Sequence, residues 1–188
     1  MTDTDTELRK MVVGHLRQLH ALQVGALDMF AGMLAAVRAE RDGGKLPEVT
    51  DLLTNMLNAF GQHEEETKRH EREVRQRLTE LGAKPNRVAE PAMRAGGRAR
   101  VLMGRVGGQD YGANARDAFV FEHLEIAVCE LLERAAARVG DERTAEMARA
   151  HKHDNEEMAA KIRRNWENVL SLRLACAGVS PARGRVPA

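Results

Sequence analysis

The chain has 188 residues, which favours a single domain with a sizeable core over two domains. Charged residues make up 30% and hydrophobic residues 43% of it, which is typical of a soluble globular protein and not of a disordered one. The formal net charge of +1 gives no whole-chain attraction for nucleic acid or for a membrane surface. The polar, acidic start at residues 1–9 does not resemble a signal peptide, and we find no apolar run that predicts a membrane span. Two cysteines without paired spacing, Cys129 and Cys176, indicate reduced thiols, so we expect a cytoplasmic protein.

Helices are the predicted secondary structure throughout. Aromatic residues are only 3% of the chain, while Ala, Leu, Glu, Arg and Met are abundant, which favours helix over strand. The first predicted helix follows possible N-cap residues at 2–6 and runs to about Glu40. Its core stripe has three- and four-residue spacing and is apolar except at Gln23, where a polar amide needs hydrogen-bond partners or a ligand.

The second predicted helix opens at residues 47–50 and runs to Leu81, before Gly82 and Pro85. Its stripe is apolar at both ends but polar in the middle, where a plain helical bundle would place Leu or Ala. These central positions are His63, Thr67 and His70, with Glu66 on the flank.

Residues 83–114 break the helical pattern with prolines and glycines and carry several arginines. A segment of this length suits a crossover that takes the chain from one end of a helical bundle to the other. Residues 93–106 favour a short helix within it. We interpret its arginines as a solvated basic loop in preference to a site for an anionic partner.

The third predicted helix spans about 115–139 and contains two glutamates, Glu122 and Glu125, that share one face with apolar neighbours. Burying two carboxylates without a partner is costly, so a metal ion or basic side chains should accompany them. The fourth predicted helix runs from about Asp141 to Ala175, with His151 and Asp154 among its inward positions. Residues 1–175 would thus form the bundle and residues 176–188 a disordered tail.

A polar interruption near the middle of each of four helices predicts an all-α, ferritin-like four-helix bundle with a shared site in its core. Carboxylate and imidazole ligands suit iron or manganese, and bridging carboxylates could hold two ions. A purely structural role stays open for each residue, because a histidine or glutamate in a helix is often a hydrogen-bonded core group or a surface group. The candidate metal ligands are Gln23, His63, Glu66, Glu122, Glu125, His151 and Asp154.

Two motifs resemble a known family. The segment AFGQHEEET at residues 59–67, followed by LGAKP at 81–85, is similar to the second helix of the YciE/YciF-like ferritin-like stress proteins. The segment EHLEIA at 122–127 resembles that family's third-helix motif. The resemblance implies a ferritin-like four-helix fold, a homodimer, a dinuclear metal site and a link to stress responses.

Carried over by position, the resemblance supports His63, Glu66, Glu122 and Glu125 as metal ligands. The chain departs from the family pattern where Gln23 replaces a glutamate of the first helix. It also departs at residues 154–155, where Asp-Asn replaces a pair of glutamates.

Two function classes follow. The first is a metal-binding ferritin-like protein that holds iron or manganese and oxidises ferrous iron or removes peroxide. The alternative is a non-enzymatic helical interaction protein whose polar core residues form a hydrogen-bond network that fixes helix register. Nothing in the sequence identifies a catalytic residue or an organic substrate, and nucleic-acid binding through the arginine-rich crossover is disfavoured.

Overall fold

The structure is a computed structural model that describes residues 3–44, 46–85 and 110–179. These ranges are all-α, as the sequence predicts, with five α-helices, one short 3-10 helix and no strand. The predicted short helix at 93–106 and the predicted tail beyond residue 179 lie outside the described residues. The elements are α1 (Asp3–Asp42), η1 (Pro47–Val49), α2 (Thr50–Glu80), α4 (Tyr111–Arg138), α5 (Glu142–Arg164) and α6 (Trp166–Cys176).

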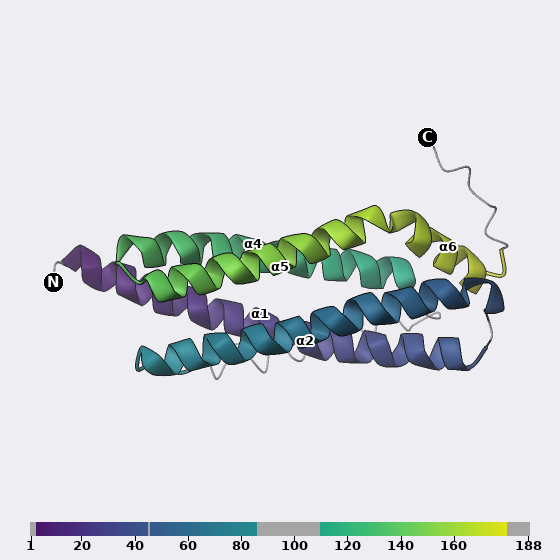
Figure 1. The fold of residues 1–188 in the computed structure, drawn as a ribbon, viewed down its shortest axis with the longest axis horizontal. Helices are drawn as coiled ribbons and strands as arrows, with labels where there is room; N and C mark the ends of the chain where they lie inside the picture. The colour runs from purple at the N-terminus through teal and green to yellow at the C-terminus, as the bar shows by residue number, and fades with distance from the viewer. Residues whose placement is uncertain (1–2, 45, 86–109, 180–188) are drawn as a thin grey trace.

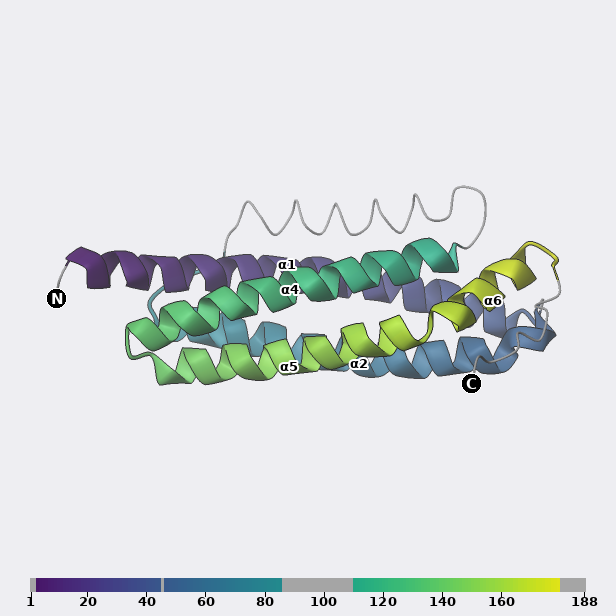
Figure 2. The ribbon, with the colours of Figure 1, turned by 90° about the horizontal axis from the view of Figure 1, so that it is seen from above.

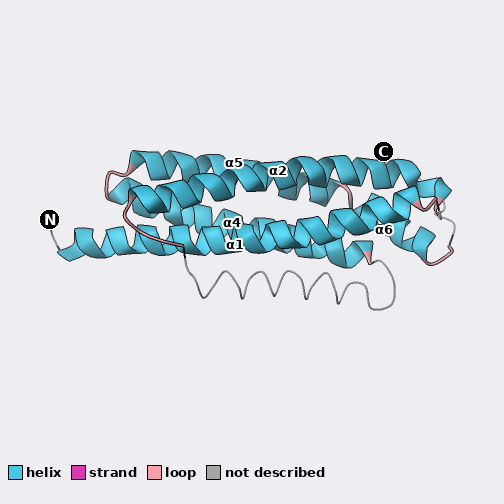
Figure 3. Cartoon of the chain, turned by 90° about the horizontal axis from the view of Figure 1, so that it is seen from below, coloured by secondary structure: helices cyan, strands magenta, loops and turns pink. Residues whose placement is uncertain are grey.

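Four long helices, α1, α2, α4 and α5, lie lengthwise beside one another and give the molecule an elongated shape (Figure 1). Helix α1 packs against α2 and α4, α4 packs against α5, and α2 contacts α5. The view from above separates α1 and α4 from α2 and α5, so the four helices surround a common interior (Figure 2). Helix α6 lies at the end of the molecule opposite the start of α1 (Figure 3).

The core stripe predicted for the first helix is confirmed. Its apolar positions are buried almost completely: Val12, Leu16, Leu19, Phe30 and Leu34. By length and composition α1 could cross a membrane, which the sequence analysis did not anticipate. Most of its apolar stretch, 67%, is buried inside the protein, and the core helix of a soluble protein passes the same test.

Side-chain caps set where two of the helices begin. Asp110 accepts a hydrogen bond from the backbone N–H of Ala113 at 3.0 Å, and Asp141 accepts one from that of Thr144 at 3.1 Å. Because Asp110 is the cap, α4 starts at Tyr111, earlier than the predicted Ala115. Gly140, with φ of +69°, makes the left-handed turn that separates α4 from α5.

The predicted fourth helix is in fact two helices, which corrects the prediction of one helix to about Ala175. The break falls at Asn165, whose side-chain Nδ2 donates to the carbonyl oxygen of Lys161 at 2.8 Å. The backbone N–H of Asn165 donates to Ile162, three residues back, at 2.9 Å. Asparagine favours such local bonds over helical ones, so α5 ends here and α6 starts in a new direction.

Candidate functional site

A layer of polar side chains crosses the middle of the apolar core. It draws on all four long helices, and no member is more than 4% exposed. We call this set the polar layer: Gln23 of α1, His63 of α2, Glu122 and Glu125 of α4, and Asn155 of α5. Sequence reasoning found four of the five. The structure buries all four and joins His63 to Glu122 at 2.9 Å.

His63 is held between two carboxylates. Its Nε2 lies 2.9 Å from Oε1 of Glu122, and its Nδ1 lies 3.2 Å from Oε2 of Glu66, one turn along α2. The edge of the Phe30 ring packs against its imidazole, with ring centroids 5.4 Å apart. Burial lowers the pKa of His63, but the hydrogen bond and charge of Glu122 and the hydrogen bond of Glu66 outweigh it and raise the pKa to about 8. His63 is therefore an imidazolium at neutral pH.

Glu125 is buried and is hydrogen-bonded across the layer to α5. Its Oε2 accepts a hydrogen bond from Nδ2 of Asn155 at 3.2 Å. Burial, reinforced by the charge of Glu122, raises the pKa of Glu125 to about 8. At neutral pH a proton therefore neutralises Glu125, while Glu122 is balanced by the His63 imidazolium.

Two members of the layer carry buried polar atoms that have no hydrogen-bond partner in the described part of the chain. These atoms are Oε2 of Glu122 and both side-chain atoms of Gln23, Oε1 and Nε2. An unsatisfied buried polar group costs about 1–3 kcal/mol, more if it is charged. Two neighbours of Gln23 on the same face of α1 contact α2: His20 contacts Glu71, and Phe30 contacts His63. Gln23 lies between them on α1 and therefore faces the same stretch of α2.

His151 and Asp154, two candidate ligands on the fourth helix, contact α2 in a second group. Nε2 of His151 lies 2.8 Å from Oε2 of Glu73, and Oδ2 of Asp154 lies 3.0 Å from Nε2 of His70. The rings of His70 and His151 stack with centroids 3.9 Å apart. Arg69 also donates to Asp154, at 2.6 Å.

We call His70, His151, Asp154, Glu73 and Arg69 the histidine cluster. Burial lowers the pKa of both histidines to about 4, and for His70 the neighbouring His151 adds to this effect. Both rings are thus neutral at pH 7. The hydrogen bonds of His151 and Asp154 within the described ranges join them to this cluster, so these two residues are placed away from the polar layer.

Asn155 takes the inward place on α5 that the sequence analysis gave to Asp154. Asn155 is 1% exposed as a whole residue, whereas the side chain of Asp154 is 28% exposed. The three- and four-residue spacing of His151, Asn155, Met158 and Ile162 was the signal that could have identified it.

The polar layer contains side chains of the types that coordinate iron or manganese. Carboxylates and an imidazole are suitable ligands, and the unpartnered oxygen atoms of Glu122 and Gln23 could accept a cation. Within the described ranges, however, no three His, Cys, Asp or Glu side chains already converge as a metal site. The donor set therefore fits one ion chemically, but His63 would have to give up its contacts with the glutamates.

Fold and site together define an all-α protein of lengthwise-packed helices with a partly charged, water-excluded layer in its core. Residues 45–175 match the family described as "Domain of unknown function (DUF892)", and the chain belongs to this family. No curated protein matches the chain. It is similar in fold to the crystal structure of a protein from Xanthomonas campestris pv. campestris, with a TM-score of 0.69 at 19% identity. That similarity covers 92% of this chain and 99% of the other.

Proposed function

We propose that this chain is a ferritin-like four-helix protein that binds one iron or manganese ion in its polar layer. The observation that carries the proposal is the pair of buried glutamates, Glu122 and Glu125, together with an unpartnered Glu122 oxygen and an unpartnered, fully buried Gln23 amide. His63 and Glu66 are the further ligands that the layer offers. Oxygen donors with one imidazole suit these metals, whereas a structural zinc site would favour thiolates.

Charge balance favours one ion over the dinuclear centre that the family resemblance implies. Three carboxylates, Glu66, Glu122 and Glu125, carry three negative charges when ionised, and Gln23 and Asn155 add none. Two divalent ions would leave an excess positive charge in a region of low dielectric constant, which is costly. A single divalent ion leaves one negative charge, and Glu66, at 23% side-chain exposure, can share that charge with solvent.

Protons compete with the metal for these ligands. Below about pH 8 both His63 and Glu125 hold a proton that an ion would have to displace. Metal affinity should therefore rise with pH, and binding should release protons. The ion would supply a centre for electron transfer to dioxygen or peroxide, so ferrous iron oxidation and peroxide removal are the activities to assay. A homodimer in the cytoplasm with a role in stress responses completes this proposal.

Metal analysis after growth with added iron or manganese tests the proposal. We expect about one ion per wild-type chain, and loss of the ion from a variant that combines Glu122→Gln with Glu125→Gln, because both charged ligands are removed. Glu156→Gln, at an exposed position of α5, is the control and should keep the ion. Less than about a tenth of an ion per wild-type chain at pH 9 would overturn the proposal, because His63 and Glu125 are then largely deprotonated.

A non-enzymatic helical protein is the second candidate. It is favoured by the contacts of His63, which already satisfy both ring nitrogens, and by the absence of a converging ligand set in the described ranges. In that case the layer fixes helix register, and a chelator leaves the melting temperature unchanged. Metal that binds only the native state would instead raise the melting temperature, and the rise would grow with the logarithm of the metal concentration.

A further inference from the structure

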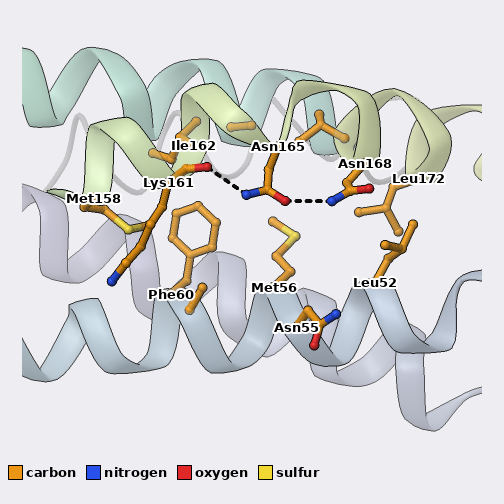
Figure 4. A pocket seen from close by; sticks show the side chains of 13 residues that line it. Leu52, Asn55, Met56, Phe60, Met158, Lys161, Ile162, Asn165, Asn168 and Leu172 are labelled. Carbon is orange, nitrogen blue, oxygen red and sulfur yellow. Dashed lines mark hydrogen bonds between the residues drawn. The ribbon is translucent and has the colours of Figure 1, made fainter. Parts of the chain in front are cut away.

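A cavity of about 240 Å³ opens between α2 and the break that separates α5 from α6 (Figure 4). Its walls are mostly apolar. Phe60 and Met56 face it from α2, and Met158 and Ile162 face it from α5 (Figure 4). Small residues at two lining positions, Ala59 and Ala115, leave the space unfilled.

The amides at the helix break are already engaged with one another. Asn165 donates to the carbonyl oxygen of Lys161 at 2.8 Å and accepts a hydrogen bond from Nδ2 of Asn168 at 2.6 Å (Figure 4). Both hydrogen bonds lie at the helix break, so these amides have partners without a ligand. The remaining polar groups of the described lining are the Asn55 amide and the Lys161 ammonium group, of which only Lys161 is charged.

Lys161 carries the only charge among the described residues that line the cavity. Its side chain leaves α5 beside Met158 and extends past Phe60 (Figure 4). Lys68 and Lys152 are each paired with glutamates, at 2.7 Å and 2.6 Å, whereas Lys161 has no ion pair within the described ranges. A mostly apolar space with one unpaired cation at its side suits an amphipathic anion.

We propose that this cavity binds a free, unbranched monocarboxylate of medium chain length, because its mostly apolar walls suit an alkyl chain and Lys161 is the one cation in its described lining. The carboxylate pairs with the Lys161 ammonium group, and the chain lies among Met56, Phe60 and Met158. An uncharged apolar ligand would form no ion pair with Lys161. This site needs no metal, so its existence is independent of the function proposed for the polar layer.

Methionine methyl NMR with sodium octanoate tests the location. We expect octanoate to shift the methyl signals of Met56 and Met158, which line the cavity. The signals of Met29 and Met33, buried in α1 and absent from the lining, are internal controls and should stay in place. Unchanged lining signals at millimolar octanoate, or equal shifts of all four, would overturn the proposal.

Calorimetric titration tests the ligand class. Lys161→Gln should weaken octanoate binding by about fivefold, the usual scale of a partly exposed ion pair, and leave 1-octanol binding unchanged. Lys10→Gln on α1, far from the lining in sequence and paired with Glu7, is the charge control and should bind octanoate like the wild type. Ala59→Trp, which fills the space, should abolish binding of both ligands. Equal octanoate affinity in wild type and Lys161→Gln would refute recognition of the carboxylate, and binding by Ala59→Trp would refute the site.

Discussion

The polar layer makes the metal-free protein sensitive to alkaline pH. The raised pKa of Glu125 means that the folded chain keeps a proton which the unfolded chain loses above about pH 4.5. Its contribution to stability is complete below that pH and is lost as the pH rises through about 8. The raised pKa of His63 acts in the same direction, with a contribution complete below about pH 6.5 and lost through about pH 8.

The size of the effect follows from the distance between pH 7 and these pKa values. Between pH 7 and the folded-state pKa of about 8, each group is protonated in the folded chain and largely deprotonated in the unfolded chain. This difference of about one pH unit lowers the free energy of unfolding by roughly 1.4 kcal/mol per group. The free energy of unfolding should therefore fall by up to about 3 kcal/mol between pH 7 and pH 9. With a urea m-value of about 2 kcal/mol/M, the urea midpoint should fall by about 1–1.5 M.

Urea denaturation of chelator-treated protein at pH 7, 8 and 9 measures this change. Glu125→Gln cannot ionise, so its midpoint should fall by about half as much as that of the wild type. Glu156→Gln, exposed on α5, should follow the wild type and controls for the loss of a carboxylate. If wild type and Glu125→Gln lose the same stability between pH 7 and 9, the proton assigned to Glu125 is wrong.

Three further predictions concern other parts of the core. The lowered pKa values of His70 and His151 mean that the unfolded chain binds more protons between pH 6.5 and about 4, so stability should fall with acidification over this range. His151→Gln should reduce that fall, as seen in urea midpoints at pH 7 and 5; an undiminished fall would contradict it. Cys176 is exposed, whereas Cys129 is buried and has a raised pKa. A thiol reagent should therefore modify only Cys176 until urea unfolds the chain. Labelling of Cys129 in the native protein would contradict this. Leu132→Ala should lower the free energy of unfolding by about 2–5 kcal/mol in urea denaturation, while Leu131→Ala, at 55% exposure, should cost less than about 1 kcal/mol.

Hydrophobic periodicity predicted the helices well but placed some of their ends incorrectly. Long core stripes marked α1 and α2, whose starts and ends agree closely with the predicted ones. The start of α4 depends on the cap at Asp110, which lies in a glycine-rich segment where the periodic signal is weak. The break at Asn165 was hidden because apolar residues such as Ile162 and Leu172 continue the stripe on both sides of it.

The candidate site was predictable where burial forces polar residues to meet. His63, Glu122 and Glu125 stand in otherwise apolar stripes, and the structure joins His63 to Glu122 at 2.9 Å. The fourth helix was harder, because Asp154 and Asn155 are adjacent and differ by about 100° around the helix. The charged residue was chosen as the ligand, but a neutral amide costs less to bury, and Asn155 is the one that points inward.

The two amides of the layer, Gln23 and Asn155, explain how it can be stable without a metal. With His63 protonated, Glu122 ionised and Glu125 neutral, these three groups sum to zero charge. Gln23→Glu would add an unpaired buried carboxylate at a fully buried position of the core, so it should destabilise the metal-free protein by about 3–5 kcal/mol, as for other unpaired buried charges. The same charge should strengthen manganese binding at least tenfold in a calorimetric titration at pH 8, because attraction between a divalent ion and a carboxylate is strong in a region of low dielectric constant. Gln18→Glu, exposed on the same helix, should change neither quantity. Destabilisation by Gln23→Glu without any gain in manganese affinity would favour a layer that serves helix register alone.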